Sequence, residues 1–303
     1  MAAHFRLHML EESNWVRLWQ LVKVAAEGAY RHNCLSVAKG AAYSALLSFF
    51  PVVTTVATLL VTARAELVSQ TIAMFLDEVV PPGTEDVVRD LFVVHGQRPT
   101  WLLVGAVMLA AWAASGTMIS LMEGFNLIYH VPADRPFLRQ RGVALMLVLI
   151  AVAPLCGASA LIVFGNRVER AWTSWLRLRP EDADLSAWVL LAGQLVRYGF
   201  AFGTVALVTA LVYYVGPNRK QTLGMVFPGA ALVTLLWLIA TAAFAWYVRH
   251  IANYNVLYGG VGAGLALLVW MYVLAVINLF GCEFNAARER GQRRVGLPTE
   301  GDA

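Results

Sequence analysis

The chain has 303 residues, of which 59% are hydrophobic and 14% are charged, and its mean hydropathy is +0.63. This composition excludes an ordinary soluble domain, whose apolar share is roughly even, and indicates a membrane protein. The net charge of +4 is explained by arginines near anionic lipid headgroups, so it requires no nucleic-acid partner.

Residues 1–39 are predicted to form a cytoplasmic N-terminal segment with an amphipathic helix. In "NWVRLWQLVKVAAEGAY" apolar residues such as Trp15 and Trp19 recur at helical spacing, whereas Arg17 and Lys23 lie elsewhere on the helical wheel. This pattern is typical of a helix at the inner membrane interface. Packing against the cytoplasmic ends of the spans fits it equally well. We expect no signal peptide, because charged residues interrupt this segment and it lacks an apolar core.

Six runs are long and apolar enough to cross a bilayer, since a helical span needs about 20 mostly apolar residues. They are residues 40–63, 101–122, 143–164, 187–214, 223–248 and 256–282. They lack the alternation of a membrane β-barrel. The expected fold is therefore all-α: a polytopic membrane protein with a bundle of six transmembrane helices, residues 40–287, plus short amphipathic helices.

Two further segments lie outside the predicted spans. The connection from Glu66 to Thr100 contains "PPG", which must break a helix, so two short amphipathic helices are expected there. The polar tail, residues 288–303, is predicted to be disordered.

Lysine and arginine are more frequent in the connections on the N-terminal side of the predicted topology than on the opposite side. By the positive-inside rule, both termini are expected in the cytoplasm. The first, third and fifth spans contain Pro51, Pro154 and Pro228. A proline removes a helical hydrogen bond, and hydroxyl groups such as that of Ser48 can bridge the break.

Four sequence blocks together resemble the YihY or BrkB family of bacterial inner-membrane proteins, once also labelled ribonuclease BN. They are "AAYSALLSFFPV", "MEGFNLIYHV" with "RPFLRQR", "YYVGPNRKQTLGMVFPGAALV", and "YNVLYGGVGAGLALLVWMYVLAVINLFGCEFNA". The resemblance covers roughly Val24 to Ala287. It implies a six-helix bundle with cytoplasmic termini in the inner membrane of a bacterium, and no settled activity.

Catalysis is not expected from the residue pattern. A metal-dependent ribonuclease needs clustered histidine and aspartate ligands, but the six histidines are scattered without H-x-H-x-D-H or H-E-x-x-H. There is also no G-x-S-x-G sequence for nucleophilic hydrolysis. Cys34, Cys156 and Cys282 show no C-x-x-C spacing, which favours buried apolar roles. We therefore expect neither a metal nor another cofactor.

A charge within a span is expensive and usually faces a bundle interior or a wet cavity. Arg197, in "LLAGQLVRYGFAFG", is the strongest such case. Two interpretations remain open for it: contact with a substrate in a cavity, or snorkelling to the outer headgroups.

A candidate polar cavity combines charged and polar residues predicted at membrane depth or near the cytoplasmic ends of the spans. Its members are Lys39, Ser48, Pro51, Glu123, Asn126, Arg197, Asn278 and Glu283. The alternative is a structural ion-pair or hydrogen-bond cluster of Lys39, Glu123 and Glu283. A further alternative is that Asn126 and Asn285 cap helix ends.

Two functions of different classes fit this sequence. In the first, the bundle is a translocation path for an anionic amphipathic substrate such as a membrane lipid. In the second, it is a non-transporting scaffold for protein partners of the cell envelope. Neither involves nucleic acid, and no nucleotide-binding domain is visible as an energy source.

Overall fold

The computed structural model describes residues 14–62, 100–132, 135–152, 183–250 and 260–294. Within these ranges the secondary structure is helical, and no residue lies in a β-strand. The helices are α2 (Asn14–Arg31), α3 (Cys34–Thr62), α6 (Thr100–Tyr129), α8 (Ala183–Val215), α9 (Leu223–His250) and α11 (Gly260–Arg294). A further helix covers residues 137–152. The all-α prediction is thus confirmed for the described part of the chain.

Five helices in the described part of the chain have the length and composition to cross a membrane, so the predicted count of six is not confirmed. Their candidate spans are Cys34–Thr55, Val104–Tyr129, Tyr198–Val215, Leu223–Val248 and Gly264–Arg293. In such helices nearly all interior backbone N–H and C=O groups are bonded within the segment, as lipid requires. The exceptions are at Pro51 in α3 and Pro228 in α9, which have no N–H to donate. The predicted third span is described only to residue 152, where it is helical. The predicted helices between Glu66 and Thr100, and Pro154, lie outside the described residues.

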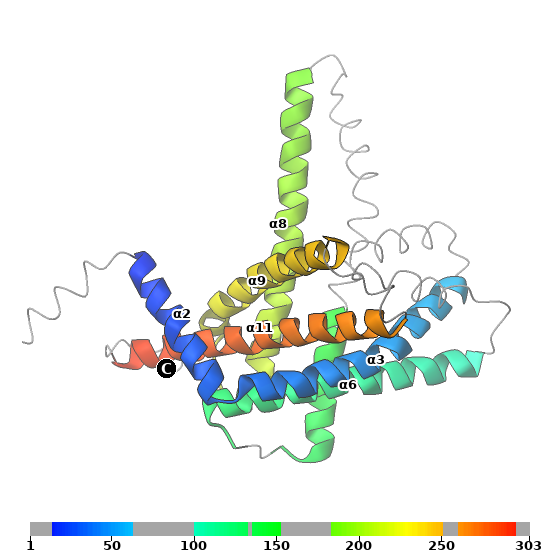
Figure 1. Ribbon diagram of the computed structural model, residues 1–303, viewed down its shortest axis with the longest axis horizontal. Helices are drawn as coiled ribbons and strands as arrows, with labels where there is room; N and C mark the ends of the chain where they lie inside the picture. Colours follow the sequence, from blue (N-terminus) through cyan, green and yellow to red (C-terminus); the bar gives the residue numbers. More distant parts are fainter. Residues whose placement is uncertain (1–13, 63–99, 133–134, 153–182, 251–259, 295–303) are drawn as a thin grey trace, which may run out of the picture.

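The helices α3, α6 and α11 lie lengthwise beside one another, and α8 crosses them steeply (Figure 1). The helix α6 runs antiparallel to α3, and α11 runs in the same direction as α6. The helix α9 packs against both α8 and α11, and α2 packs against α11 and α3. Because α11 contacts α2, α3, α6 and α9, it is the helix around which the others are arranged.

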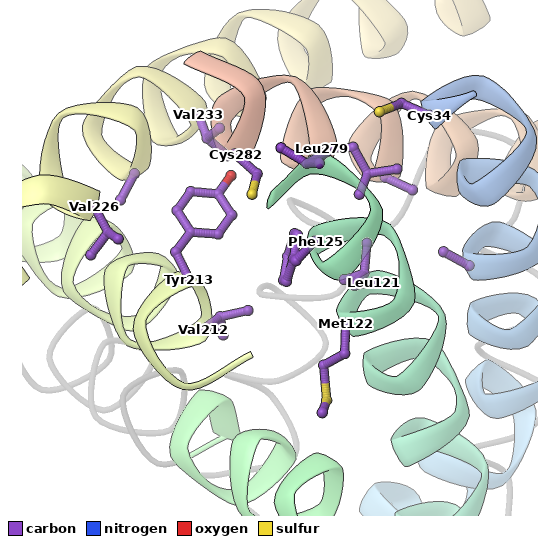
Figure 2. Packing of buried hydrophobic residues seen from close by; sticks show 14 of the residues in the cluster. Cys34, Leu121, Met122, Phe125, Val212, Tyr213, Val226, Val233, Leu279 and Cys282 are labelled. Carbon is purple, nitrogen blue, oxygen red and sulfur yellow. The ribbon is translucent and has the colours of Figure 1, made fainter. Parts of the chain in front are cut away.

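An apolar core lies where α6, α8, α9 and α11 meet. Figure 2 shows Tyr213 of α8 pointing toward Val233 of α9 and Cys282 of α11, with Phe125 of α6 beside it. All four side chains are buried. The Phe125 and Tyr213 rings meet edge to face with centroids 5.4 Å apart, a favoured aromatic geometry. This packing fixes the relative positions of four helices.

Large apolar side chains cover much of the exterior of the spans. Trp101, Met108, Leu149 and Leu238 are all exposed, Trp101 by 71%. Contiguous apolar surface of this kind is unfavourable in water and is the normal outer surface of a membrane helix. The exterior therefore agrees with the composition.

Three helices are longer than the apolar runs predict. The helix α3 begins at Cys34, α6 continues to Tyr129, and α11 continues to Arg294. Residues 288–294, expected in a disordered tail, are therefore helical. Hydrophobicity marks only the part of a helix that lies in lipid, whereas polar ends continue when their side chains find partners.

The end of α6 is set by backbone hydrogen bonds. His130 has φ 54°, its N–H donates to the Leu127 carbonyl, and the Val131 N–H donates to the Asn126 carbonyl. This pair of bonds is a Schellman motif, in which a left-handed residue ends the helix and satisfies its last carbonyls. Asn126 and Glu123 consequently lie inside α6 and not beyond its end.

Candidate functional site

The ends of several helices meet in one polar cluster. It joins the end of α2, the end of α6, the turn between α8 and α9, and the last turns of α11. We call it the polar end cluster, with members His32, Asn126, Arg135, Asn218, Arg219, Glu283, Glu289, Arg290 and Arg293. Four of the six residue pairs in this cluster connect residues far apart in the sequence, and the other two, Glu283–Arg290 and Glu289–Arg293, are neighbours on α11.

Glu283 is the most deeply buried acid of the cluster, with 1% of its side chain exposed. Its Oε1 atom pairs with His32 Nδ1, and its Oε2 atom accepts a hydrogen bond from Arg290 Nη2 at 3.4 Å. The same nitrogen of Arg290 donates to the Ile128 carbonyl at 3.4 Å. A buried carboxylate is tolerated only when it is paired. Glu283 therefore joins the end of α2 to α11 through His32, and its partner Arg290 joins α6 to α11.

Glu289 forms the second acidic centre, six residues after Glu283 on α11. Arg219 Nη2 lies 2.8 Å from Oε1 and 2.9 Å from Oε2 of this carboxylate, and Arg293 Nη2 lies 2.9 Å from Oε1. The Arg219 guanidinium also lies over the Tyr129 ring, 4.3 Å from its centroid, as in a cation–π contact. These contacts hold the α8–α9 turn against α6 and α11.

Arg135 and Asn126 also bond to the turn between α8 and α9. Asn126 Oδ1 accepts a hydrogen bond of 2.9 Å from the Asn218 N–H. Arg135 donates to Asn218 Oδ1 at 3.1 Å and to the carbonyls of Val215, Gly216 and Pro217 at 3.2 Å each. A cation at these carbonyls also suits the negative end of the α8 dipole.

Burial lowers the pKa of the Arg135 guanidinium from its usual value, and the nearby charge of Arg139 acts in the same direction. Both effects disfavour the charged form. The carbonyl acceptors around Arg135 offset this penalty by bonding its N–H groups.

Asn285 joins α11 to α9 beside a proline. Its Oδ1 atom accepts a hydrogen bond of 2.8 Å from the Gly229 N–H, and its Nδ2 atom donates to the Val226 carbonyl at 2.9 Å. The two bonded residues flank Pro228, which lies inside α9 and has no N–H of its own. Asn285 therefore bonds to the backbone of a neighbouring helix and does not cap its own.

The structure places only two of the predicted cavity residues, Asn126 and Glu283, in the polar end cluster. Ser48 is buried in α3 and donates to its own helix, at Ala45 O, 2.8 Å away. It therefore does not bridge the carbonyl of Leu47, the residue to which the Pro51 nitrogen would have bonded. Pro51 is half-buried.

Asn278 is buried, and its backbone carbonyl accepts a 2.6 Å hydrogen bond from the Tyr213 hydroxyl. The side-chain oxygen Oδ1 has no hydrogen-bond partner among the described residues. Asn278 thus has one polar atom that the packing leaves unsatisfied.

The alternative cluster of Lys39, Glu123 and Glu283 is not formed. Lys39 and Glu123 are both exposed, and neither makes an ion pair with a residue of the described ranges. The core-facing side of α3 carries Ala38 and Ala41, so Lys39 lies outside the contact with α11. The partners of Glu283 are His32 and Arg290 instead.

Arg197 lies on α8, and its side chain is outside what the structure describes. Both interpretations of this arginine therefore stay predictions.

Sequence reasoning missed most members of the polar end cluster. His32 lies in the short break between α2 and α3, and Arg290 and Arg293 lie in the presumed tail. One signal was present: Glu289 and Arg293 have the i, i+4 spacing of a helical ion pair. Arg219 and Glu289, which pair across the cluster, are 70 residues apart in the sequence, a separation that no local pattern reports.

Within the described ranges, no three His, Cys, Asp or Glu side chains come together as a set able to hold a metal ion. His32 and His130 are close, with ring centroids 4.8 Å apart in an edge-to-face contact.

These features define a polytopic α-helical membrane protein whose helix ends are joined by a buried ionic cluster. The chain belongs to the BrkB family, since the family described as Virulence factor BrkB matches residues 25–302. This confirms the resemblance that the four sequence blocks indicate.

Named relatives agree with this assignment. YfkH of Bacillus subtilis (strain 168), which is named as ribonuclease-like, is 29% identical over 89% of this chain and 94% of its own. A UPF0761 membrane protein of Tolumonas auensis is 26% identical over 90% of this chain and 82% of its own. Another, from Alkalilimnicola ehrlichii, is 25% identical over 92% of this chain, which spans 60% of that relative. No solved structure matches the chain.

Proposed function

We propose that this protein provides a translocation path for an anionic amphipathic molecule, with a membrane lipid as the substrate class. The observation that carries the proposal is the charge distribution at the polar end cluster. The acids Glu283 and Glu289 are buried and paired, whereas basic side chains face outward. The exposed basic residues of this end are Arg31, Lys39, Lys220, Arg290 and Arg293.

This arrangement gives the end of the molecule a positive surface. A basic surface beside a membrane attracts anionic headgroups, by about 1 kcal/mol for each lysine or arginine near the lipid surface. Glu283 and Glu289 are buried and paired with basic side chains that include Arg290 and Arg293. The attraction therefore comes mainly from Arg31, Lys39 and Lys220, and the exposed acids Glu27 and Glu123 reduce it. The geometry thus supports concentration of anionic headgroups at one end of the helices.

Polar atoms along the spans support a path from that end. The hydroxyl oxygens of Thr55 on α3 and Thr117 on α6 are buried and lack hydrogen-bond partners among the described residues. Leaving such a group unpaired costs about 1–3 kcal/mol. A polar headgroup or water that passes along these helices would supply the missing partner.

The same cluster supports the proposed orientation. α2 and the last turns of α11 are joined by His32 and Glu283, so the segments near the two termini lie at one end of the helices. By the positive-inside rule, this basic end belongs in the cytoplasm, and the protein belongs in the inner membrane of a bacterium. We also propose a non-enzymatic role, because the described polar groups serve to connect helices.

The test is lipid movement in reconstituted vesicles. The protein is incorporated into phosphatidylcholine vesicles that carry a trace of fluorescent phosphatidylglycerol or fluorescent phosphatidylcholine, and dithionite reports how much label reaches the outer leaflet. We expect faster movement of the anionic lipid than in protein-free vesicles. The paired variant Lys39→Gln with Lys220→Gln should slow the anionic lipid more than the zwitterionic one. The proposal is rejected if the protein is folded and both lipids move no faster than in protein-free vesicles.

A second candidate, the non-transporting scaffold, is favoured by one observation. On α2, Trp19 and Tyr30 are 60% and 80% exposed, and Lys23 lies over the Trp19 ring at 5.3 Å. Aromatic residues beside basic ones are common both at protein interfaces and at membrane surfaces. A Trp19→Ala variant that keeps full lipid movement but loses a stoichiometric, crosslinkable membrane partner would favour the scaffold.

A further inference from the structure

Arg141 forms an unusual contact with the middle of α6. It belongs to the helix of residues 137–152, and its guanidinium carbon lies over the Trp112 ring, 3.8 Å from the ring centroid. Its Nη2 atom also donates to the Trp112 carbonyl at 3.2 Å. Stacking on tryptophan fixes the plane and direction of the guanidinium group.

The hydrogen-bonding capacity of Arg141 is largely unused. The Trp112 carbonyl already accepts a shorter bond, 2.6 Å, from the Ser115 hydroxyl. The Nε atom of Arg141 is buried and has no hydrogen-bond partner within the described ranges. No described carboxylate forms an ion pair with this side chain. The positive charge is therefore held in place, and no carboxylate of the described residues compensates it.

The surroundings of this charge are apolar. Trp112 lies within the candidate span Val104–Tyr129 and is 51% exposed, and its neighbours Met108 and Leu109 are exposed as well. The contact is thus at the outer surface of a membrane helix, where lipid is the surrounding medium. An arginine at such a place is costly unless an anion accompanies it.

We propose that Arg141 and Trp112 form a binding site for the phosphate group of an anionic lipid. A guanidinium presents two N–H groups as a fork that matches two phosphate oxygens. Because Nε of Arg141 is buried, the fork offered to the phosphate is formed by the two Nη nitrogens, of which Nη2 keeps one N–H beside its bond to the Trp112 carbonyl. The inference rests on the proposed function, since it names the residue that would meet the headgroup of the same substrate class. A free phosphate ion shares this chemistry, so the test separates the two sources.

A purely structural role for Arg141 predicts a different outcome. A side chain that only packs on Trp112 would not distinguish phosphatidylglycerol from phosphatidylcholine. Arg139, on the same helix and exposed, is the matched control because it carries the same charge without the Trp112 contact.

The experiment measures equilibrium retention of phosphatidylglycerol by the full-length protein in phosphatidylcholine nanodiscs, for the wild type, Arg141→Gln, Arg141→Lys and Arg139→Gln. We expect Arg141→Gln to weaken retention about tenfold, as for loss of a charge-assisted phosphate contact, and Arg139→Gln to change it less than about twofold. Arg141→Lys should be intermediate, because lysine keeps the charge but lacks the fork. If Arg141→Gln does not fold, the retention of phosphatidylglycerol by Arg141→Lys is compared with that by Arg139→Gln instead.

Equal retention by the wild type and folded Arg141→Gln would overturn the inference, as would equal losses in Arg141→Gln and Arg139→Gln. A third outcome is that inorganic phosphate binds the wild type in detergent but not Arg141→Gln, while neither protein retains phosphatidylglycerol selectively. That result would support a phosphate site at Arg141 and identify free phosphate, not a lipid, as its ligand. Retention and lipid movement are measured separately. Selective retention in a protein that moves no lipid would support the site and count against the proposed function alone.

Discussion

Gly28 of α2 lies directly against Glu283 of α11, so closely that a Cβ atom on residue 28 would stand 2.6 Å from the Glu283 Oε2 atom. The carboxylate occupies this space while it pairs with His32 and Arg290. The absence of a side chain at residue 28 and the buried acid at residue 283 are therefore two parts of one contact between the helices.

Gly28→Ala should destabilise the attachment of α2 to α11. The added methyl group displaces a carboxylate that its two partners hold in place, and overpacking of this kind costs about 1–3 kcal/mol. Thermal unfolding in detergent, with the mobility of a spin label on α2, measures the effect. Gly40→Ala is the control, because no atom lies within 4 Å of a Cβ there. Equal melting temperatures for the two variants would contradict this account of Gly28.

Glu283→Ala should be among the more damaging single changes in the polar end cluster. It leaves His32 and Arg290 facing a buried space without their acid, and breaking a buried pair costs about 3–5 kcal/mol. We expect the lower part of that range, because the Arg290 side chain is 46% exposed and keeps access to solvent. Glu123→Ala removes an exposed glutamate and should change the free energy of unfolding by less than about 0.5 kcal/mol.

Gly281→Ala should force α9 and α11 apart. A Cβ at residue 281 would lie 2.0 Å from Val233 Cγ2, 2.6 Å from the Tyr213 hydroxyl and 3.1 Å from the Gly229 carbonyl oxygen. Because the last of these is backbone, side-chain rotation alone gives little relief, and we expect a loss of about 3 kcal/mol or more. Gly264→Ala, also on α11, has no atom within 4 Å of its Cβ and should be neutral. A stable, monodisperse Gly281→Ala protein would argue against such close packing.

Asn285→Asp should weaken the contact beside Pro228 although the shape of the side chain is kept. The amide nitrogen that donates to the Val226 carbonyl becomes an acceptor facing another acceptor, while the bond from the Gly229 N–H remains. Loss of a buried donor costs about 1–3 kcal/mol, and more when a charge is left unpaired. Unfolding in detergent at two pH values tests this, since protonation of the new aspartate should restore part of the stability.

Tyr213→Phe should remove a single hydrogen bond from the core. The Tyr213 hydroxyl donates to the Asn278 carbonyl over 2.6 Å, and such a bond is worth about 0.5–1.5 kcal/mol. Tyr214→Phe alters a residue that is 40% exposed and serves as the control in the same unfolding experiment. A Tyr213→Phe protein as stable as this control would show that the bond contributes nothing net.

The amino-acid sequence by itself determines that this chain is an all-helical membrane protein and which family it belongs to. Long apolar runs have one solution in lipid, because a helix satisfies its own backbone groups, and the observed α6 and α9 include the predicted runs 101–122 and 223–248. The family follows from local blocks such as "YYVGPNRKQTLGMVFPGAALV", which are read directly from the order of residues.

The tertiary structure alone decides which polar residues meet. Glu283 was recognised as a polar group near a helix end, but its partners are His32, which is 251 residues away, and Arg290. Lys39 and Glu123 look equally suitable in the sequence and are exposed. Pairing depends on the rotation of each helix about its axis and on its register against its neighbours. Close contacts at Gly28, Gly229 and Gly281 set the rotation and the register of their helices. The periodicity of apolar residues in the sequence predicts little of either.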